Sequence, residues 1–247
     1  MEVRILENSE VLGRNAAEYV AEHLKKCIKE QGSARIVLST GASQFDTLKA
    51  LVEIEGIQWD KVEMFHLDEY VDLPITHIAS FRKYLQERFV DKVGPLKAVH
   101  FVDGTKECIE KLTVEIRKAP IDIGLIGIGE NGHIAFNDPP ADFDTKEAYI
   151  IVNLNDTCKK QQMGEGWFAT IDDVPKQAVS MTAYQIMQCK KIVSCVPHKV
   201  KADAIKKTLM AEEVSNLVPA TLLKTHPDFI LFVDANSASE ISGVVMK

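Results

Sequence analysis

A histidine in a glycine-rich turn, close to a carboxylate, is the group in this sequence best suited to chemistry. His133 lies in the segment 127–140, which reads GIGENGHIAFNDPP, and Asp138 follows it. An apolar run at 121–126 precedes the segment and predicts a buried strand. Histidine transfers protons near neutral pH, and a neighbouring carboxylate orients the imidazole and raises its basicity. The pattern predicts proton transfer at the end of this strand. The alternative is a histidine that only caps a tight turn.

Two adjacent acids end another predicted strand. The strand at 62–67 runs into Asp68 and Glu69. Because two carboxylates in one cleft would repel each other, we expect one to face the cleft and the other to make a structural contact. A carboxylate in a partly dry cleft can remove a proton next to a carbonyl group. Asp68 is therefore a candidate general base, and capping of the following turn is the alternative.

A turn of small residues between a strand and a helix could hold an anion. The strand is predicted at 36–38, the helix ends near residue 53, and the turn consists of Ser39, Thr40, Gly41, Ala42 and Ser43. Backbone N–H groups at the start of such a helix favour a negative charge. Helix capping by Ser43 explains the same residues without a ligand. The turn is not a P-loop, because no Gly-Lys-Ser/Thr follows it.

Lysines follow a further predicted strand. The segment 197–203 reads PHKVKAD and joins the strand at 191–196 to a helix at 199–210. A lysine in the first turn of a helix is poorly matched to the helix dipole, and an anionic ligand would offset that mismatch. A solvated side chain is the alternative, and we prefer it for Lys199.

Several other kinds of site are not indicated. The remaining histidines at 23, 77, 100 and 226 show no metal-ligand spacing, and no Cys/His cluster resembles a zinc site. No G-x-S-x-G elbow of a serine hydrolase is present. The five cysteines are widely spaced without a C-x-x-C pair. This usage predicts reduced thiols in a cytoplasm rather than a disulfide framework.

Length and composition describe an ordinary globular chain. Its 247 residues are 46% hydrophobic and 26% charged, which suits a full core, and we expect one domain over 1–247. The formal net charge of −7 argues against a nucleic-acid binder, which usually shows a basic footprint. No apolar run approaches the length of a membrane span. The first residues predict a short strand and not a signal peptide.

Strand-like and helix-like segments alternate along the whole chain. This alternation predicts βαβ units and a mostly parallel sheet with helices on both faces. The region 137–181 is the least regular, and could form a lid or an antiparallel edge near the site. Beyond the strands already given, strands are predicted at 3–6, 99–102, 148–154, 178–181 and 228–233. Further helices are predicted at 9–30, 80–93 and 105–118, with Thr182 capping another.

Taken together, these loops resemble the glucosamine-6-phosphate deaminase (isomerase) family. Residues 67–74 are similar to the family's L-D-E-Y-x-x-L-P, and 127–139 to its G-x-G-x-(D/N)-G-H-I-(A/G)-F-N-E-P, with Asp138 in place of the glutamate. The T-G-G-T phosphate turn falls on 40–43, V-P-K-x-A-x-(T/S)-M on 174–181, and K-A-(E/D)-A on 201–204. The resemblance covers nearly the whole chain. It implies a Rossmann-like three-layer α/β sandwich with a mostly parallel central sheet.

The resemblance implies a hydrolase/isomerase that needs no cofactor and no metal. An amino-sugar 6-phosphate and water would give a ketose 6-phosphate and ammonia, as in the conversion of glucosamine 6-phosphate to fructose 6-phosphate. It implies that His133 opens the sugar ring, that Asp68 moves a proton between C2 and C1, and that Asp138 holds and tunes His133. Asn131 completes the catalytic set. The resemblance places the substrate and its phosphate on Ser39, Thr40, Gly41, Ala42, Ser43, Gly129 and Lys201.

The resemblance implies that the partner is a small sugar phosphate and that the protein binds neither nucleic acid nor membrane. It implies a cytoplasmic location and leaves a homo-oligomer open.

One departure from the family pattern concerns the family's phosphate-clamping arginine, which should lie shortly after 156–157. The segment 158–168 reads CKKQQMGEGWF and contains no arginine. Either Lys159 or Lys160 substitutes for it, or the substrate is held differently.

Three other functions remain open. A galactosamine-6-phosphate isomerase/deaminase needs the same chemistry and differs only at C4. A 6-phosphogluconolactonase typically carries D-E-R and G-H-x-A-S-L-F-P in the two loops that hold Asp68 and His133, unlike this chain. A non-catalytic sugar-phosphate sensor would need no Asp68/His133 pair, because binding requires no proton transfer.

Overall fold

Seven parallel strands form the central sheet of the computed structural model, which describes residues 1–164 and 166–241. The strand order is β1-β10-β9-β6-β2-β3-β5, and each neighbouring pair runs parallel. The predicted α/β class with a mostly parallel sheet is therefore confirmed. The strands are β1 (Glu2–Leu6), β2 (Ala34–Leu38), β3 (Val62–His66), β5 (Ala98–His100), β6 (Ile123–Leu125), β9 (Ile192–Val196) and β10 (Phe229–Asp234).

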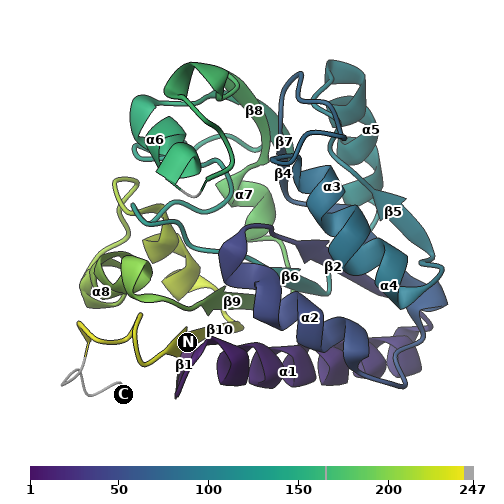
Figure 1. Ribbon diagram of the computed structural model, residues 1–247. Coiled ribbons are helices and arrows are strands. Elements are labelled where there is room, and N and C mark those ends of the chain that lie inside the picture. The colour runs from purple at the N-terminus through teal and green to yellow at the C-terminus, as the bar shows by residue number, and fades with distance from the viewer. Residues whose placement is uncertain (165, 242–247) are drawn as a thin grey trace.

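Helices cover both faces of this sheet (Figure 1). In β2 the side chains of Ile36 and Leu38 enter one apolar core, while Val37 between them enters the other, as the alternation of a strand requires. The first core is covered by α1 (Ser9–Gln31), α2 (Phe45–Glu53), α3 (Phe81–Leu85), the π-helical η3 (Gln86–Val90) and α4 (Asp91–Val93). The second is covered by α5 (Lys106–Ile116), α7 (Ala183–Ile186) and α8 (Ala202–Met210).

Helix ends follow signals in the sequence. The Asn8 side chain accepts the Val11 N–H at 2.9 Å and begins α1, and Gly32, at φ +80°, ends it. Thr182 caps α7 as predicted, because its hydroxyl accepts the Gln185 N–H. The predicted helix at 199–210 begins as a 3₁₀ turn. The 3₁₀ segments are η1 (Ala42–Gln44), η2 (Trp59–Lys61), η4 (Ile171–Asp173), η5 (Lys199–Lys201) and η6 (Pro219–Thr225).

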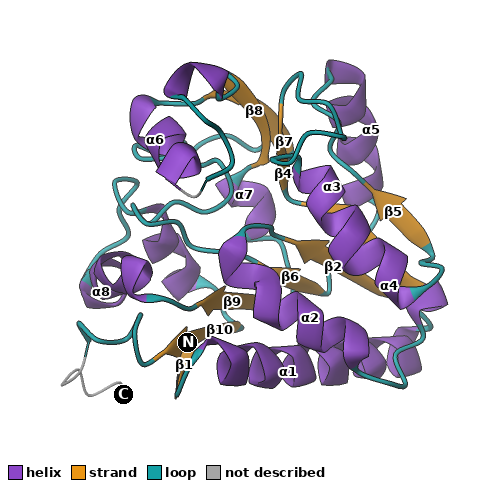
Figure 2. Ribbon diagram, viewed as in Figure 1, coloured by secondary structure: helices purple, strands orange, loops and turns teal. Residues whose placement is uncertain are grey.

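A small antiparallel sheet continues from the carboxyl end of β3. Its order is β4 (Asp68–Tyr70), β8 (Gln177–Met181) and β7 (Tyr149–Asn153). The acidic segment 68–70 is thus a strand, and the region 137–181 is more regular than its sequence indicates. It also contains α6 (Asp156–Gly164), which lies beside this sheet in the upper part of the view (Figure 2). The sequence did not predict α6, because its two buried residues, Cys158 and Gln162, make no apolar stripe.

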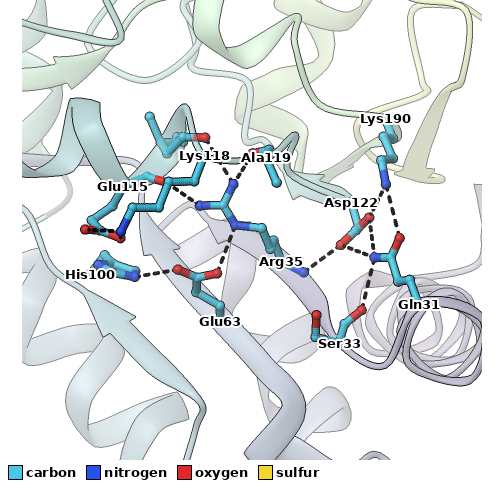
Figure 3. Close-up of polar contacts among 11 residues, drawn as sticks. Gln31, Ser33, Arg35, Glu63, His100, Glu115, Lys118, Ala119, Asp122 and Lys190 are labelled. Atoms are coloured by element: carbon cyan, nitrogen blue, oxygen red, sulfur yellow. Dashed lines mark hydrogen bonds and ion pairs between the residues drawn. The ribbon is translucent and has the colours of Figure 1, made fainter.

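Arg35 ties α5 to the starts of β2 and β3 (Figure 3). Its Nε donates to Glu63 Oε2 at 2.9 Å. Its terminal nitrogens donate to the carbonyl oxygens of Glu115, Ile116 and Ala119 at the end of α5. Capturing the last carbonyls of a helix with a cation satisfies groups that the helix itself leaves unpaired.

Three groups of metal-ligand type meet in this network. Ligand atoms of Glu63, His100 and Glu115 lie within 4.8 Å of one another, although the sequence spacing gave no sign of it. Both carboxylates are already paired: Glu63 with Arg35 and with His100 Nε2 at 2.8 Å, and Glu115 with Lys118 at 2.6 Å (Figure 3). We therefore read the cluster as structural ion pairing.

None of the described helices is both long and apolar enough to cross a membrane. All five cysteines are buried free thiols, as their spacing predicts.

Candidate active site

A cavity lies at the carboxyl ends of four neighbouring strands, β9, β6, β2 and β3. Ligands of open α/β sheets bind at this edge, because loops from several strands converge there. Nine of the predicted site residues line it: Ser39, Thr40, Gly41, Ala42, Ser43, Asp68, Gly129, His133 and Lys201. The other two, Asn131 and Asp138, contact the imidazole of His133. The structure thus brings the four sequence segments together at one site.

His133 is held by its Nδ1 nitrogen. Nδ1 lies 2.7 Å from Asn131 Oδ1 and 3.2 Å from Asp138 Oδ1. Both neighbours are hydrogen-bond acceptors, so Nδ1 carries the proton in the neutral ring. No described residue hydrogen-bonds to Nε2, whose lone pair is therefore available to a ligand in the cavity. The ring packs against the bare α-carbon of Gly129, where a side chain would collide with it.

Asn131 and Asp138 form a small network behind the imidazole. Asn131 Oδ1 accepts the backbone N–H of His133 at 3.0 Å, and its amide donates to Asp138 Oδ1 at 3.1 Å. Burial alone would raise the pKa of Asp138, but the hydrogen bond and charge of His133, with the hydrogen bond from Asn131, outweigh burial and lower it. Asp138 is therefore an anion beside the ring. The shorter side chain of aspartate still reaches His133.

Asp68 and Glu69 face different surroundings, as expected for adjacent acids at a cleft. Asp68 lines the cavity, whereas Glu69 is fully buried beneath it. The Glu69 carboxylate accepts the Ser80 hydroxyl at 2.9 Å and the backbone N–H groups of Phe81 and Arg82 at 3.2 and 2.9 Å. These N–H groups begin α3, so Glu69 satisfies a helix start, and Arg82 also pairs with its charge at 3.3 Å.

The environment of Asp68 favours its neutral form. Burial, followed by the negative charge of Glu69, raises the pKa of Asp68 to about 8. Desolvation disfavours a carboxylate, and a like charge nearby adds to the effect. A carboxyl group with a pKa near neutrality is matched to the role of a general base, because its carboxylate is a stronger base than an ordinary one and is still partly ionised near neutral pH.

The small-residue turn presents backbone and hydroxyl groups to the cavity. Gly41 adopts φ +99°, a conformation that favours glycine, and its carbonyl accepts the Tyr84 hydroxyl at 3.1 Å. No side chain caps the helix start that follows, and the Ser43 hydroxyl instead accepts a hydrogen bond from Gln44. The capping alternative for Ser43 is therefore wrong. The buried hydroxyl of Ser39 has no partner among the described residues, as a ligand-binding group would.

Lys201 and Lys199 differ as the sequence suggests. Lys201 is 8% exposed and lines the cavity at the end of η5. Lys199 points to the surface, where its amine donates to the Ser239 hydroxyl at 2.7 Å and lies 3.4 Å from Glu240.

The cavity is also lined by residues that no sequence motif indicates. Gln161 and Gln162 of α6 line it, whereas neither Lys159 nor Lys160 does. Gln162 is 6% exposed, and its Oε1 accepts the Tyr70 hydroxyl at 2.6 Å. That bond orients the amide and leaves its N–H groups without a partner among the described residues. No motif pointed to Gln162, because its role depends on contact with a distant strand.

Comparisons with known proteins agree on one family. Residues 7–231 match the family described as glucosamine-6-phosphate isomerases/6-phosphogluconolactonase. The chain is 35% identical over 256 residues to a glucosamine-6-phosphate deaminase of Thermoanaerobacter pseudethanolicus, covering 100% of this chain and 98% of that one. It is also 35% identical over 235 residues to a Staphylococcus epidermidis glucosamine-6-phosphate deaminase, covering 91% and 95%.

Solved structures show the same fold. The structure of a monomeric glucosamine-6-phosphate deaminase superposes with a TM-score of 0.86 at 27% identity, covering 97% of this chain and 100% of that one. A 6-phosphogluconolactonase from Thermotoga maritima superposes with a TM-score of 0.77 at 18% identity, covering 94% and 99%. At that lower identity the likeness concerns the fold alone.

Proposed function

Since the chain belongs to the family of glucosamine-6-phosphate isomerases and 6-phosphogluconolactonases, we propose that it is a deaminase/isomerase of an amino-sugar 6-phosphate. The substrate we propose is glucosamine 6-phosphate, and the products are fructose 6-phosphate and ammonia. The observation that carries the proposal is the position of Asp68 and His133 on one cavity. Binding alone would require neither a base nor a proton carrier there.

His133 opens the sugar ring in this mechanism. With its proton on Nδ1, the imidazole accepts the proton of the C1 hydroxyl at Nε2 and delivers a proton to the ring oxygen, so that C1 becomes an aldehyde. The imidazolium that forms transiently is stabilised by the Asp138 carboxylate, 3.2 Å from Nδ1. Asn131 fixes the ring's orientation through its hydrogen bonds.

Asp68 carries out the isomerisation. Its ionised carboxylate removes the proton from C2, next to the new carbonyl, and the C2 electrons form an enolamine whose C1 oxygen takes up a proton from water. Return of a proton to C1 gives the C2 imine of the ketose. Water then adds to C2 and ammonia leaves. The aldose–ketose step thus needs one carboxyl group that can return the proton it removes. The hydrolysis that releases ammonia is part of the same proposal.

In this proposal the phosphate is bound by the loops after β2 and β9. The turn Ser39 to Ser43 supplies N–H and hydroxyl donors, and Lys201 supplies a positive charge. Asp68 and Glu69 begin β4, which follows β3, the neighbour of β2 on the side away from β9. With free thiols throughout, the protein suits a reducing compartment, and a cytoplasmic location belongs to the same proposal.

An assay across a panel of hexosamine 6-phosphates tests this function. Glucosamine 6-phosphate should release ammonia and fructose 6-phosphate in equal amounts. A stronger reaction with galactosamine 6-phosphate would move the substrate to the C4 epimer. Hydrolysis of 6-phosphogluconolactone without ammonia release from any amino sugar would contradict the proposal, and so would binding without turnover.

A further inference from the structure

His198 holds a backbone conformation that histidine rarely adopts. Its φ is +81° and its ψ is 144°, a region in which a β-carbon is crowded and glycine is the usual residue. The residue is exposed, follows Pro197 after β9, precedes η5 as its N-cap, and lines the cavity together with Lys201. Strain of this kind persists only where surrounding contacts impose it, and it gathers at ligand sites.

A buried carboxylate imposes the conformation. Asp234 is 1% exposed and ends β10, the strand next to β9. Both of its carboxylate oxygens accept the His198 N–H at 3.1 Å, and Oδ1 also accepts the Ser237 N–H at 2.7 Å. The Lys201 N–H closes the turn on the His198 carbonyl at 3.0 Å. The backbone of His198 is therefore fixed from two sides.

The charges around the cavity indicate which ligand the imidazole of His198 could bind. Among the described residues that line the cavity, no arginine occurs and Lys201 is the one lysine, while Asp68 and Glu130 are acids. A phosphate monoester carries a charge of about −1.5 to −2 near neutral pH. A single lysine leaves part of this charge unmatched. An imidazole adds an N–H donor and, when protonated, a positive charge.

We propose that His198 is a second side-chain ligand of the substrate's phosphate, and that Asp234 aims it by holding the backbone at positive φ. His198 precedes the 3₁₀ turn η5 and Lys201 ends it, and both line the same cavity, so one anion there can contact both side chains. The inference rests on the proposed function only in taking the ligand to be a sugar phosphate. It identifies the residue that completes the anion site of a cavity whose described lining contains no arginine.

The variant His198→Gly tests the proposal, because glycine adopts this backbone conformation without strain and the protein will fold. We expect KM for the hexosamine 6-phosphate and Kd for inorganic phosphate, measured by calorimetry, to rise about 10-fold, with kcat within about twofold of the parent. The thermal midpoint should rise. With the unphosphorylated amino sugar, parent and variant should behave alike, which a merely structural role would not produce.

Asp72→Gly is the matched control. Asp72 also has positive φ, at +61°, but does not line the cavity, so its replacement should relieve strain and leave phosphate affinity unchanged. Parent-like KM and phosphate Kd in His198→Gly would overturn the proposal, as would an equal loss of affinity for the unphosphorylated sugar. If the parent released no ammonia, the proposed function would fail, yet phosphate binding by parent and variant would still decide the role of His198.

Discussion

The imidazole of His133 lies so close to Gly129 that a β-carbon on this glycine would be 2.1 Å from Cε1 and 2.3 Å from Nε2 of the ring. Atoms that are not bonded cannot approach to such distances. The ring cannot simply turn aside, because Asn131 and Asp138 hold Nδ1, which would itself lie 2.4 Å from that β-carbon. The glycine is therefore a condition for the position of the proton carrier.

We predict that Gly129→Ala folds but lowers kcat by about 10²-fold, the usual effect of displacing a catalytic group by about 1 Å. The measurement is steady-state kinetics together with the thermal midpoint. Gly164→Ala is the control, since a β-carbon at Gly164 meets no atom within 4 Å. Parent-like turnover in Gly129→Ala would mean that the position of His133 is not important for catalysis.

The raised pKa of Asp68 predicts the pH dependence of the reaction. A general base must be ionised, and burial beside Glu69 places the pKa of Asp68 at about 8. We expect kcat/KM to fall about tenfold per pH unit below this value and to level off above it, because kcat/KM reports the free enzyme. A profile that is level from pH 5 to 8 would show that Asp68 is not the base.

The same pKa predicts how folding stability depends on pH. The pKa of Asp68 is above its ordinary value of 3.8 in the folded state, so between pH 4 and 8 the native protein binds more protons than the unfolded chain. The free energy of unfolding should therefore fall as pH rises through this window. Asp68→Asn, which cannot ionise, should lose this contribution.

Urea denaturation at pH 5 and pH 8 measures this effect. Relative to the parent, Asp68→Asn should gain at least about 1.4 kcal/mol over this interval, the equivalent of one pKa unit. Asp172→Asn, at an exposed position, controls for the loss of one negative charge and should show no such gain. Parallel curves for parent and Asp68→Asn would contradict the burial argument.

Lys201 should contribute most of the positive charge at the phosphate. A hydrogen bond to a charged group is worth roughly 1.5–3 kcal/mol, so Lys201→Ala should lower kcat/KM by about 10- to 150-fold and weaken competition by inorganic phosphate. Lys199→Ala removes an exposed lysine of the same turn and should change neither. Equal values for the two variants would place the phosphate elsewhere.

The sequence predicts the position of a catalytic side chain where that residue follows the end of a recognisable strand. Carboxyl ends of neighbouring parallel strands meet at one edge of a sheet, so Asp68 and His133 could be expected on one cavity once the strands at 62–67 and 121–126 were identified. The separation of Asp68 from Glu69 also followed from charge repulsion alone. Which of the two faces the cavity required the structure, since α3 supplies the partners of Glu69.

The rest depends on contacts between distant segments. Gln162 lies on the buried face of α6, and its amide is oriented by a hydrogen bond from the Tyr70 hydroxyl. A helix with a polar buried face shows no helical hydrophobic pattern in its sequence. The sequence therefore points to Lys159 and Lys160 as candidate cations, whereas Gln161 and Gln162 line the cavity. The conformation of His198 is equally hidden in the sequence, because it is imposed by Asp234 from another strand.

The most direct test of the account measures ammonia and fructose 6-phosphate released from glucosamine 6-phosphate by the parent and by Asp68→Asn, with substrate binding followed in parallel. The account predicts one ammonia per ketose phosphate from the parent. It predicts a kcat about 10²- to 10⁴-fold lower for Asp68→Asn, with substrate still bound. Ammonia release by Asp68→Asn at the parent rate, or none from the parent, would contradict it.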